Sequence, residues 1–183
     1  VARRVPTILI AGNHDRRGLK RYLPWGTPNL TVIDSQDRVV VDGVALAFVG
    51  YAKTAENWAR RAKQAVGVGA DLLVAHQSFH GVKIPPSSFC FTVGRQRETV
   101  GEQHLPKVKA VLCGHIHPRQ VVDVGGIPVV HPGSTERTAF SESAQTKGYA
   151  LWELARELRW AFVDLPSRPM VTVTSADDLG RVG

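Results

Sequence analysis

An apolar, β-branched run passes directly into a polar loop in the segment Thr7-Ile8-Leu9-Ile10-Ala11-Gly12-Asn13-His14-Asp15. The run predicts a buried strand, and the residues after Gly12 then lie where that strand ends. In open α/β sheets, ligands bind in the crevice beyond the carboxyl ends of the strands. The loop is therefore a candidate functional site, and its polar side chains are Asn13, His14 and Asp15.

The same pattern occurs twice more along the chain. Leu72–Ala75 runs into His76, and Ala110–Cys113 runs into Gly114-His115-Ile116-His117. Two histidines at positions i and i+2 point to the same side of an extended backbone, and the glycine before them lets that backbone approach an ion or a phosphate. Imidazoles combined with an amide or carboxylate oxygen suit Mn, Fe or Zn better than Ca or Mg. We therefore expect the three strand ends to meet in one crevice that holds a metal.

The remaining patterns predict a mixed α/β fold with no internal repeat. Apolar residues recur at helical spacing over Ala55–Val66, with basic residues on the other side, which indicates an amphipathic helix. The pairs Asp42-Gly43 and Gly125-Gly126 separate short apolar runs and predict β-hairpins. The predicted hairpins span 38–49, 121–130 and 148–165, and Met170–Thr174 is expected to form one more strand.

Length and composition bound the class of protein. The 183 residues are enough for one domain, and 43% hydrophobic with 21% charged residues excludes a disordered chain. The longest largely apolar run, Val44–Ala52, is far too short to cross a bilayer, so we expect a cytoplasmic chain with no membrane anchor. Cys90 and Cys113 lack metal-site spacing and are expected to be reduced thiols, with Cys113 buried in a strand.

The net charge of +7, from 23 Lys and Arg against 16 Asp and Glu, has two interpretations. A moderate excess of this kind is usually a solvated surface. The other interpretation is an electrostatic footprint for phosphate or nucleic acid. Charge alone does not separate the two.

The polar motifs together resemble a known family. Gly12-Asn13-His14-Asp15, His76 and Gly114-His115-Ile116-His117 are similar to the later motifs of the calcineurin-like metallophosphoesterases. Further segments resemble the SbcD nuclease family within that superfamily, namely Pro132–Arg137, Phe140-Ser141-Glu142, Lys147-Gly148-Tyr149 and Leu165–Met170. The resemblance implies an α/β fold of the metallophosphoesterase type, a two-sheet β-sandwich flanked by helices (αββα).

The resemblance also implies a metal centre with two divalent ions, manganese being expected and iron or zinc being alternatives. Asn13, His76 and His115 would bind one ion, and His117 would help to bind the other. His14 would face the scissile phosphate, with Asp15 beside it. Neutral amide and imidazole ligands suit this chemistry, because they leave most of an ion's charge free to stabilise a phosphate.

Two residues of the SbcD-like segment are candidates for contact with DNA. Ser134 and Arg137 follow Pro132-Gly133, and Arg137 is able to reach a phosphate backbone. A salt bridge from Arg137 to Glu136 or Glu142 is an equally good interpretation.

The chain departs from the family pattern at its beginning. The family starts with an Asp-x-His strand and then a Gly-Asp motif, and Val1–Ala11 contains neither Asp nor His. We therefore expect residues 1–174 to be the C-terminal two-thirds of a catalytic domain that lacks its first strands, and 175–183 to begin a linker. On this interpretation the 183 residues alone bind metal weakly, hydrolyse little and expose an apolar sheet edge.

The leading functional hypothesis is a DNA exonuclease or endonuclease that acts on double-strand ends or hairpins. The resemblance implies an SbcC-like ATPase as its partner and a homodimer for the full-length protein. One alternative is a general phosphodiesterase for cyclic nucleotides or small phosphoesters. Another is a degenerate domain that binds DNA or protein without catalysis.

Overall fold

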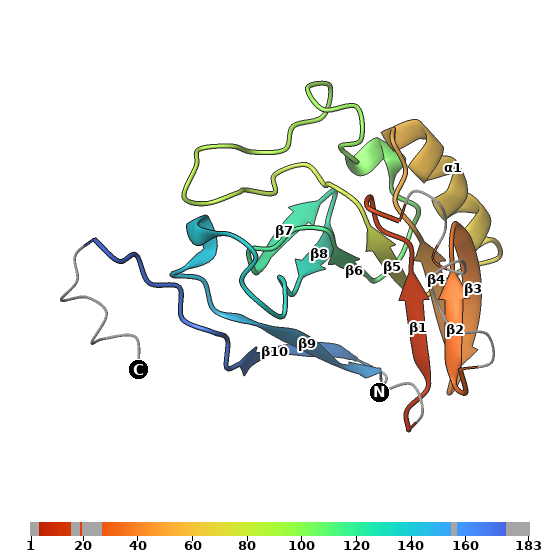
Figure 1. Ribbon diagram of the computed structural model, residues 1–183. Coiled ribbons are helices and arrows are strands. Elements are labelled where there is room, and N and C mark those ends of the chain that lie inside the picture. The colour runs from red at the N-terminus through yellow and green to blue at the C-terminus, as the bar shows by residue number, and fades with distance from the viewer. Residues whose placement is uncertain (1–3, 16–18, 20–26, 155–156, 175–183) are drawn as a thin grey trace.

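The computed structural model describes residues 4–15, 19, 27–154 and 157–174. A six-stranded sheet with the order β3-β4-β5-β6-β8-β7 lies at its centre (Figure 1). Its strands are β3 (Gln36–Val41), β4 (Val44–Val49), β5 (Leu72–His76), β6 (Ala110–Gly114), β7 (Gln120–Val124) and β8 (Ile127–His131). The large central sheet and the few helices confirm the predicted α/β class.

Two smaller sheets accompany the central one. In the first, β1 (Thr7–Ile10) pairs in parallel with β2 (Leu30–Ile33). In the second, β9 (Lys147–Leu154) pairs antiparallel with β10 (Leu158–Leu165). Strand β1 therefore belongs to a different sheet from β5 and β6, so the three polar strand ends come from more than one sheet.

The central strands are parallel and buried, as their continuous apolar runs predict. Strand β4 pairs with β5, β5 with β6, and β6 with β8, all in parallel. Leu72, Leu73 and Val111 are almost completely inaccessible to solvent. All carboxyl ends of these strands consequently lie at one edge of the sheet, where their loops meet.

Both hairpins of the central sheet turn where the sequence predicts. The β3–β4 turn has positive φ at Asp42 (49°) and Gly43 (83°), and the β7–β8 turn has positive φ at Gly125 (63°) and Gly126 (81°). Positive φ at both central residues is the geometry of a type I′ turn, which matches the twist of the strands it joins.

Helix α1 (Ala55–Val66) begins and ends as predicted. The Thr54 side chain accepts a hydrogen bond from the backbone N–H of Asn57, which caps the first turn. The helix buries Trp58 and Ala62 among its apolar residues, and the Trp58 ring meets Phe79 edge-on at 5.5 Å. Figure 1 shows α1 beside β3 and β4, with which it is in contact.

Two elements differ from the sequence prediction. Met170–Thr174 is not a strand, since residues 166–174 have no regular structure. Val171–Thr174 are exposed, so this segment gains no burial that would offset the cost of ordering a strand. Strand β2 is the second difference, because no strand is predicted there from the sequence. Its four residues are too few for a clear alternating pattern.

The β9–β10 hairpin carries apolar side chains on both faces. The rings of Trp152 and Trp160 stack across the strands with centroids 5.0 Å apart. Tyr149 and Leu151, which alternate with them, are exposed, Leu151 to 60%. No helix among the described residues has the length and apolarity to cross a membrane. The predicted tail at 175–183 lies outside the described residues.

Candidate metal centre

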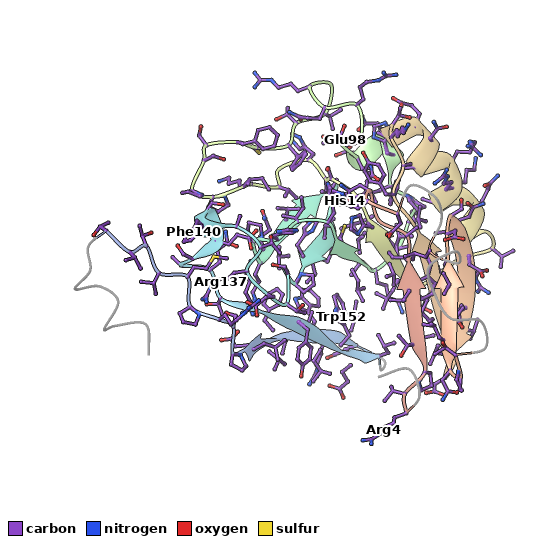
Figure 2. All side chains as sticks on the ribbon, viewed as in Figure 1. Arg4, His14, Glu98, Arg137, Phe140 and Trp152 are labelled. Atoms are coloured by element: carbon purple, nitrogen blue, oxygen red, sulfur yellow. The ribbon has the colours of Figure 1, made fainter. Side chains whose placement is uncertain are left out.

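The three predicted strand ends meet, although they come from two sheets. His76 ends β5 opposite Gly114 at the end of β6, so the polar residues after both strands lie side by side. The end of β1 is attached to them through Ala11, whose carbonyl accepts a hydrogen bond from the N–H of Tyr51 at 2.9 Å. Figure 2 shows the labelled His14 beyond the end of β1, on the side of the central strands.

Asn13, His76 and His115 form a compact group of donors. His76 Nε2 lies 3.0 Å from Asn13 Oδ1, and the rings of His76 and His115 have centroids 5.0 Å apart. Without an ion, Nε2–H donates to the amide oxygen. A separation of about 3 Å also suits two neighbouring ligands of one ion, because each metal–ligand bond is about 2.1 Å long.

Two glycines make room for the His76 ring. A Cβ atom on Gly12 would lie 3.0 Å from His76 Cε1, and one on Gly114 would lie 3.1 Å from His76 Nδ1. Both distances are shorter than comfortable van der Waals contact. Gly12 and Gly114 therefore form a glycine cradle around the His76 ring, because any residue with a Cβ atom at either position would crowd the ring.

His115 adopts a backbone conformation that is rare for its residue type. Its φ is 83°, in the left-handed region that favours glycine. This turn brings the imidazole back toward β5, where the ring lies 5.0 Å from His76 and 5.9 Å from Tyr51 between centroids. Backbone strain of this kind is found at functional sites, where the surrounding structure holds it.

The electrostatic environment keeps both imidazoles neutral. Burial, reinforced by the neighbouring His115, lowers the pKa of His76 to about 4. Burial also lowers the pKa of His115, although the charge of Glu98 acts in the opposite direction. A neutral imidazole keeps a lone pair on one ring nitrogen, so both rings are able to coordinate an ion at neutral pH, His76 through Nε2 once its proton has moved to Nδ1.

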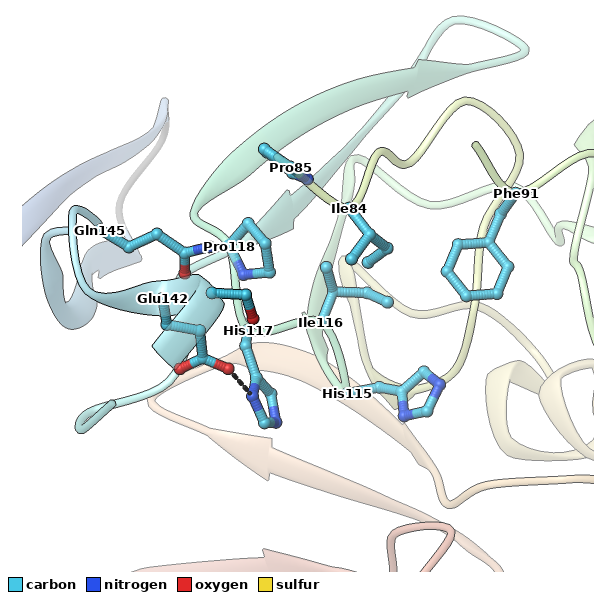
Figure 3. Close-up of a pocket in the computed structure, with 10 residues that line it drawn as sticks. Ile84, Pro85, Phe91, His115, Ile116, His117, Pro118, Glu142 and Gln145 are labelled. Atoms are coloured by element: carbon cyan, nitrogen blue, oxygen red, sulfur yellow. Dashed lines mark hydrogen bonds and ion pairs between the residues drawn. The ribbon is translucent and has the colours of Figure 1, made fainter. Parts of the chain in front are cut away.

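His117 is held in place by a carboxylate. Its Nδ1 lies 2.7 Å from Glu142 Oε1, the contact drawn as a dashed line in Figure 3, and 3.1 Å from Thr138 Oγ1. The Thr138 hydroxyl and Glu142 Oε1 are also 3.1 Å apart. Because an imidazole whose Nδ1–H donates to a carboxylate presents Nε2 as a ligand, Glu142 fixes both the orientation and the tautomer of His117.

Lys147 completes this network from β9. Its side chain is fully buried, and Nζ donates to Glu142 Oε2 at 2.8 Å and to Ser134 Oγ at 2.8 Å. Burial alone raises the pKa of Glu142, but the hydrogen bonds from Lys147, His117 and the Thr138 backbone outweigh it and bring the pKa to about 2. Glu142 is thus a carboxylate at every physiological pH.

His14, which the resemblance predicts to face the phosphate, borders the same crevice. A cavity of about 450 Å³ is lined by Asn13, His14, His76, His115, His117 and Ser134, together with backbone of the two loops. The exposed His14 therefore faces the space that the other histidines line. Asp15 turns back, because its Oδ2 accepts a hydrogen bond from the backbone N–H of Gly12 at 2.8 Å. Asp15 thereby fixes the loop that carries Asn13.

Arg137 is engaged within the protein. Its guanidinium donates to the carbonyl oxygens of Arg168 at 2.7 Å and of Gln145 at 3.1 Å. These bonds attach the segment after β10 to the loop before β9. Ion pairing of Arg137 with Glu136 or Glu142 is absent from the contacts of the described residues.

The donor set fits one divalent ion. One amide oxygen and two neutral imidazoles converge on the glycine cradle, and His117 lines the same cavity. Within the described residues, no three side chains of the types His, Cys, Asp and Glu are close enough to hold an ion by themselves. The candidate set therefore includes Asn13, whose amide oxygen is the third donor beside the imidazoles of His76 and His115.

Residues 1–157 match the family model of the calcineurin-like phosphoesterase superfamily domain. The chain belongs to the calcineurin-like phosphoesterase superfamily. Phosphoesterases of this superfamily use divalent metal ions, in agreement with the donor set of Asn13, His76 and His115. The predicted superfamily is confirmed by this match.

Solved structures of low identity are also similar to this phosphoesterase. One is named as a 5′-nucleotidase, from Staphylococcus aureus in complex with alpha-ketoglutarate, with 16% identity and a TM-score of 0.49 over 94% of this chain and 40% of that chain. Another is Vps29 with zinc from Entamoeba histolytica, with 11% identity and a TM-score of 0.30 over 86% of this chain and 98% of that chain. The chain thus spans less than half the length of the Staphylococcus aureus protein. No curated protein matches the sequence.

Sequence reasoning missed the residues that support the ligands of the phosphoesterase site. Lys147 entered only as part of a family resemblance, and Glu142 only there and as a candidate salt-bridge partner of Arg137. Thr138 and Tyr51 were not predicted at all. Glu142 lies 25 residues from His117, so no local spacing links them. The sequence signal for this network is weak. It consists of Glu142 and Lys147, five residues apart and downstream of Gly133-Ser134, and their pairing is known only from the structure.

Proposed function

We propose that this chain provides metal-dependent hydrolysis of phosphodiesters, with DNA as the substrate. The main support is the meeting of Asn13, His76 and His115 at one edge of the sheet, with both imidazoles neutral. Such ligands carry no charge of their own. They leave a bound ion's positive charge available to the developing charge of a phosphoryl transition state.

The side chains divide the work in this reaction. When bound, a divalent ion supplies positive charge for the phosphate and activates water. Asn13, His76 and His115 hold that ion, and His117 extends the set. Hydrolysis adds a water oxygen to phosphorus and breaks one P–O ester bond, and His14 donates a proton to the leaving oxygen. Gly12 and Gly114 keep the His76 ring in place throughout.

DNA as the substrate has two supports. The net charge of +7 lowers the repulsion that a polyanion would otherwise meet. The segment from Pro132 to Gly148 resembles SbcD nucleases, and it contains Glu142, which contacts His117, and Lys147, which binds Glu142 and Ser134. On the same resemblance we propose an SbcC-like ATPase partner and a homodimer for the full-length protein.

Hydrolysis is tested with manganese and bis(p-nitrophenyl) phosphate, a chromogenic phosphodiester. We expect manganese-dependent release of p-nitrophenol, slow for the 183 residues alone, that is lost in His115→Ala and kept in His80→Ala, because His80 is exposed and does not line the cavity. Manganese binding, measured by the loss of its free-ion electron paramagnetic resonance signal, should weaken in the first variant only. Equal manganese binding by both variants would refute the assignment.

DNA binding is tested by fluorescence anisotropy with a blunt duplex over a salt series. We expect affinity to fall steeply with salt, with a slope set by the number of phosphates contacted. Absence of binding at low salt, combined with hydrolysis of the chromogenic diester, would instead support a phosphodiesterase for small substrates. DNA binding without hydrolysis in manganese would support a degenerate binding domain.

A further inference from the structure

A second cavity adjoins the metal centre. It has a volume of about 290 Å³ and lies between the loop before β7 and the long loop that follows β5 (Figure 3). Two of its lining residues, His115 and His117, also line the crevice of the metal centre. A molecule whose phosphate reaches the histidines is therefore able to place a neighbouring group in this cavity.

The walls of this second cavity are mainly apolar. Ile84 and Phe91 come from the long loop, and Ile116 and Pro118 come from the loop that carries the histidines. Phe89 meets the Phe91 ring edge-on, with centroids 4.9 Å apart and an interplanar angle of 89°. This contact, together with packing of the half-buried Phe91 against the core, restricts the orientation of the Phe91 ring. A fixed aromatic ring on an apolar wall is a stacking platform for a flat group.

One end of the cavity is polar. Gln145 and Ser141 line it beside Glu142, whose oxygens are already bound by His117, Thr138 and Lys147. Gln145 Oε1 accepts a hydrogen bond from Lys147, and Figure 3 shows its amide nitrogen on the side of Pro118. The polar end therefore offers an amide donor and a hydroxyl, rather than a free charge.

The size of the cavity limits its occupant. Pockets for whole small-molecule ligands span about 300 to 1,000 Å³, so this one holds a single ring system and not a chain of nucleotides. A nucleobase has the required features, namely apolar faces, a hydrogen-bonding edge and no charge. A free sugar has less apolar surface and no flat face, and a second phosphate has no apolar surface.

We propose that this cavity is a subsite for the nucleobase next to the scissile phosphate, with Phe91 as its stacking residue and Gln145 as a donor to the base edge. The proposal rests on the phosphoesterase function proposed above and names part of its substrate. It assigns the long loop after β5 a role in substrate selection, which the metal ligands themselves do not require.

The test is equilibrium binding, which does not depend on turnover. Isothermal titration calorimetry in manganese compares thymidine 5′-monophosphate, 2-deoxyribose 5-phosphate and inorganic phosphate on the full chain. We expect the nucleotide to bind at least about tenfold more tightly than the sugar phosphate, as stacking on one aromatic ring provides. Phe91→Ala should abolish this difference and leave the affinity for the sugar phosphate unchanged.

Three further variants make the result decisive. Phe91→Tyr keeps the ring and should keep the preference, which separates stacking from a general loss of structure. Gln145→Leu should weaken nucleotide binding alone. Phe140→Ala serves as the control, because Phe140 is 65% exposed and does not line the cavity.

The outcomes test the nucleobase subsite separately from the proposed phosphoesterase function. Equal affinities for nucleotide and sugar phosphate, or equal losses for both in Phe91→Ala, would overturn the subsite and leave the phosphoesterase function standing. Failure of all three compounds, inorganic phosphate included, to bind would overturn both.

Discussion

Glu142 illustrates how a single buried side chain supports a candidate metal ligand, His117. It lies between a buried cation, Lys147 Nζ at 2.8 Å, and an imidazole, His117 Nδ1 at 2.7 Å. A buried charge is stable only where partners compensate it, so each of these groups depends on the others. The orientation of His117 is therefore tied to the stability of the fold around β9.

The first prediction concerns this buried pair. Glu142→Gln should lower the free energy of unfolding by about 3 kcal/mol, because it leaves the Lys147 ammonium without a counter-charge in a fully buried position. Urea denaturation followed by tryptophan fluorescence measures the loss. The double variant Glu142→Gln with Lys147→Met should recover much of it, and a double variant no more stable than the single one would contradict this account.

The double variant also allows a test of His117. With the fold recovered, an amide replaces the carboxylate beside His117, and because an amide offers both a donor and an acceptor, it no longer fixes the tautomer. We expect manganese affinity to fall by about tenfold or more, in the range found when such outer carboxylates are removed. Lys147→Met alone does not serve as the control, since it leaves Glu142 buried without its cation. Thr138→Val is the milder comparison, and it should have the smaller effect.

At the scale of elements, the end of β8 adds a pH-sensitive group. His131 is completely buried, and burial lowers its pKa to about 4. In the unfolded chain a histidine titrates near 6.5, so between these values the unfolded state binds more protons than the folded state. The stabilising contribution is complete above about pH 6.5 and is lost as the pH falls toward 4.

The pH dependence of the free energy of unfolding measures the contribution of His131. Between pH 7 and pH 5 the free energy of unfolding should fall by about 2 kcal/mol more in the natural chain than in His131→Gln, which has no group that titrates there. Urea denaturation at both pH values gives the two slopes. Parallel slopes in the two proteins would show that His131 does not contribute.

The elements themselves are largely predictable from the sequence. Strong local signals define α1 and both hairpins of the central sheet, through helical spacing with a Thr54 cap and through turn pairs that tolerate positive φ. Strand β2 escaped prediction because four residues hold too little pattern, and Met170–Thr174 was predicted wrongly because apolar alternation does not guarantee a neighbouring strand. Whether a segment pairs as a strand depends on the neighbour that the fold brings to it, and the local sequence does not show that neighbour.

The candidate site was predictable to the same extent. Asn13, His76 and His115 follow apolar runs, so the general rule for strand ends placed them together even though β1 lies in its own sheet. The supports of His117 were not predictable, because Glu142 reaches it only through tertiary contact. Position along a strand is local information, whereas a partner across the fold is not.

At the scale of the whole molecule, the β9–β10 hairpin is the exposed apolar surface that stands out. Tyr149 and Leu151 lie on one side of a two-stranded sheet and are 43% and 60% exposed. An exposed apolar strand can pair with a strand of another chain, which promotes association. This hairpin therefore sets how readily the isolated chain associates.

Self-association provides the corresponding prediction. Leu151→Lys should reduce the association of the isolated chain, seen by light scattering at increasing concentration, because a charged side chain on an exposed strand opposes pairing. Val68→Lys is the matched control, since Val68 is 100% exposed and lies outside the strands. A similar reduction in both variants would indicate a general effect of charge.

At His115, the left-handed backbone conformation lowers the stability of the fold while it places the imidazole in the candidate metal centre. A histidine at φ 83° costs about 1 to 3 kcal/mol relative to a relaxed conformation, and glycine adopts the same φ without that cost. Optimising the chain for thermal resistance alone would therefore favour His115→Gly and remove a proposed metal ligand in doing so. Screens that rank variants of this protein by melting temperature would select against its chemistry at this position.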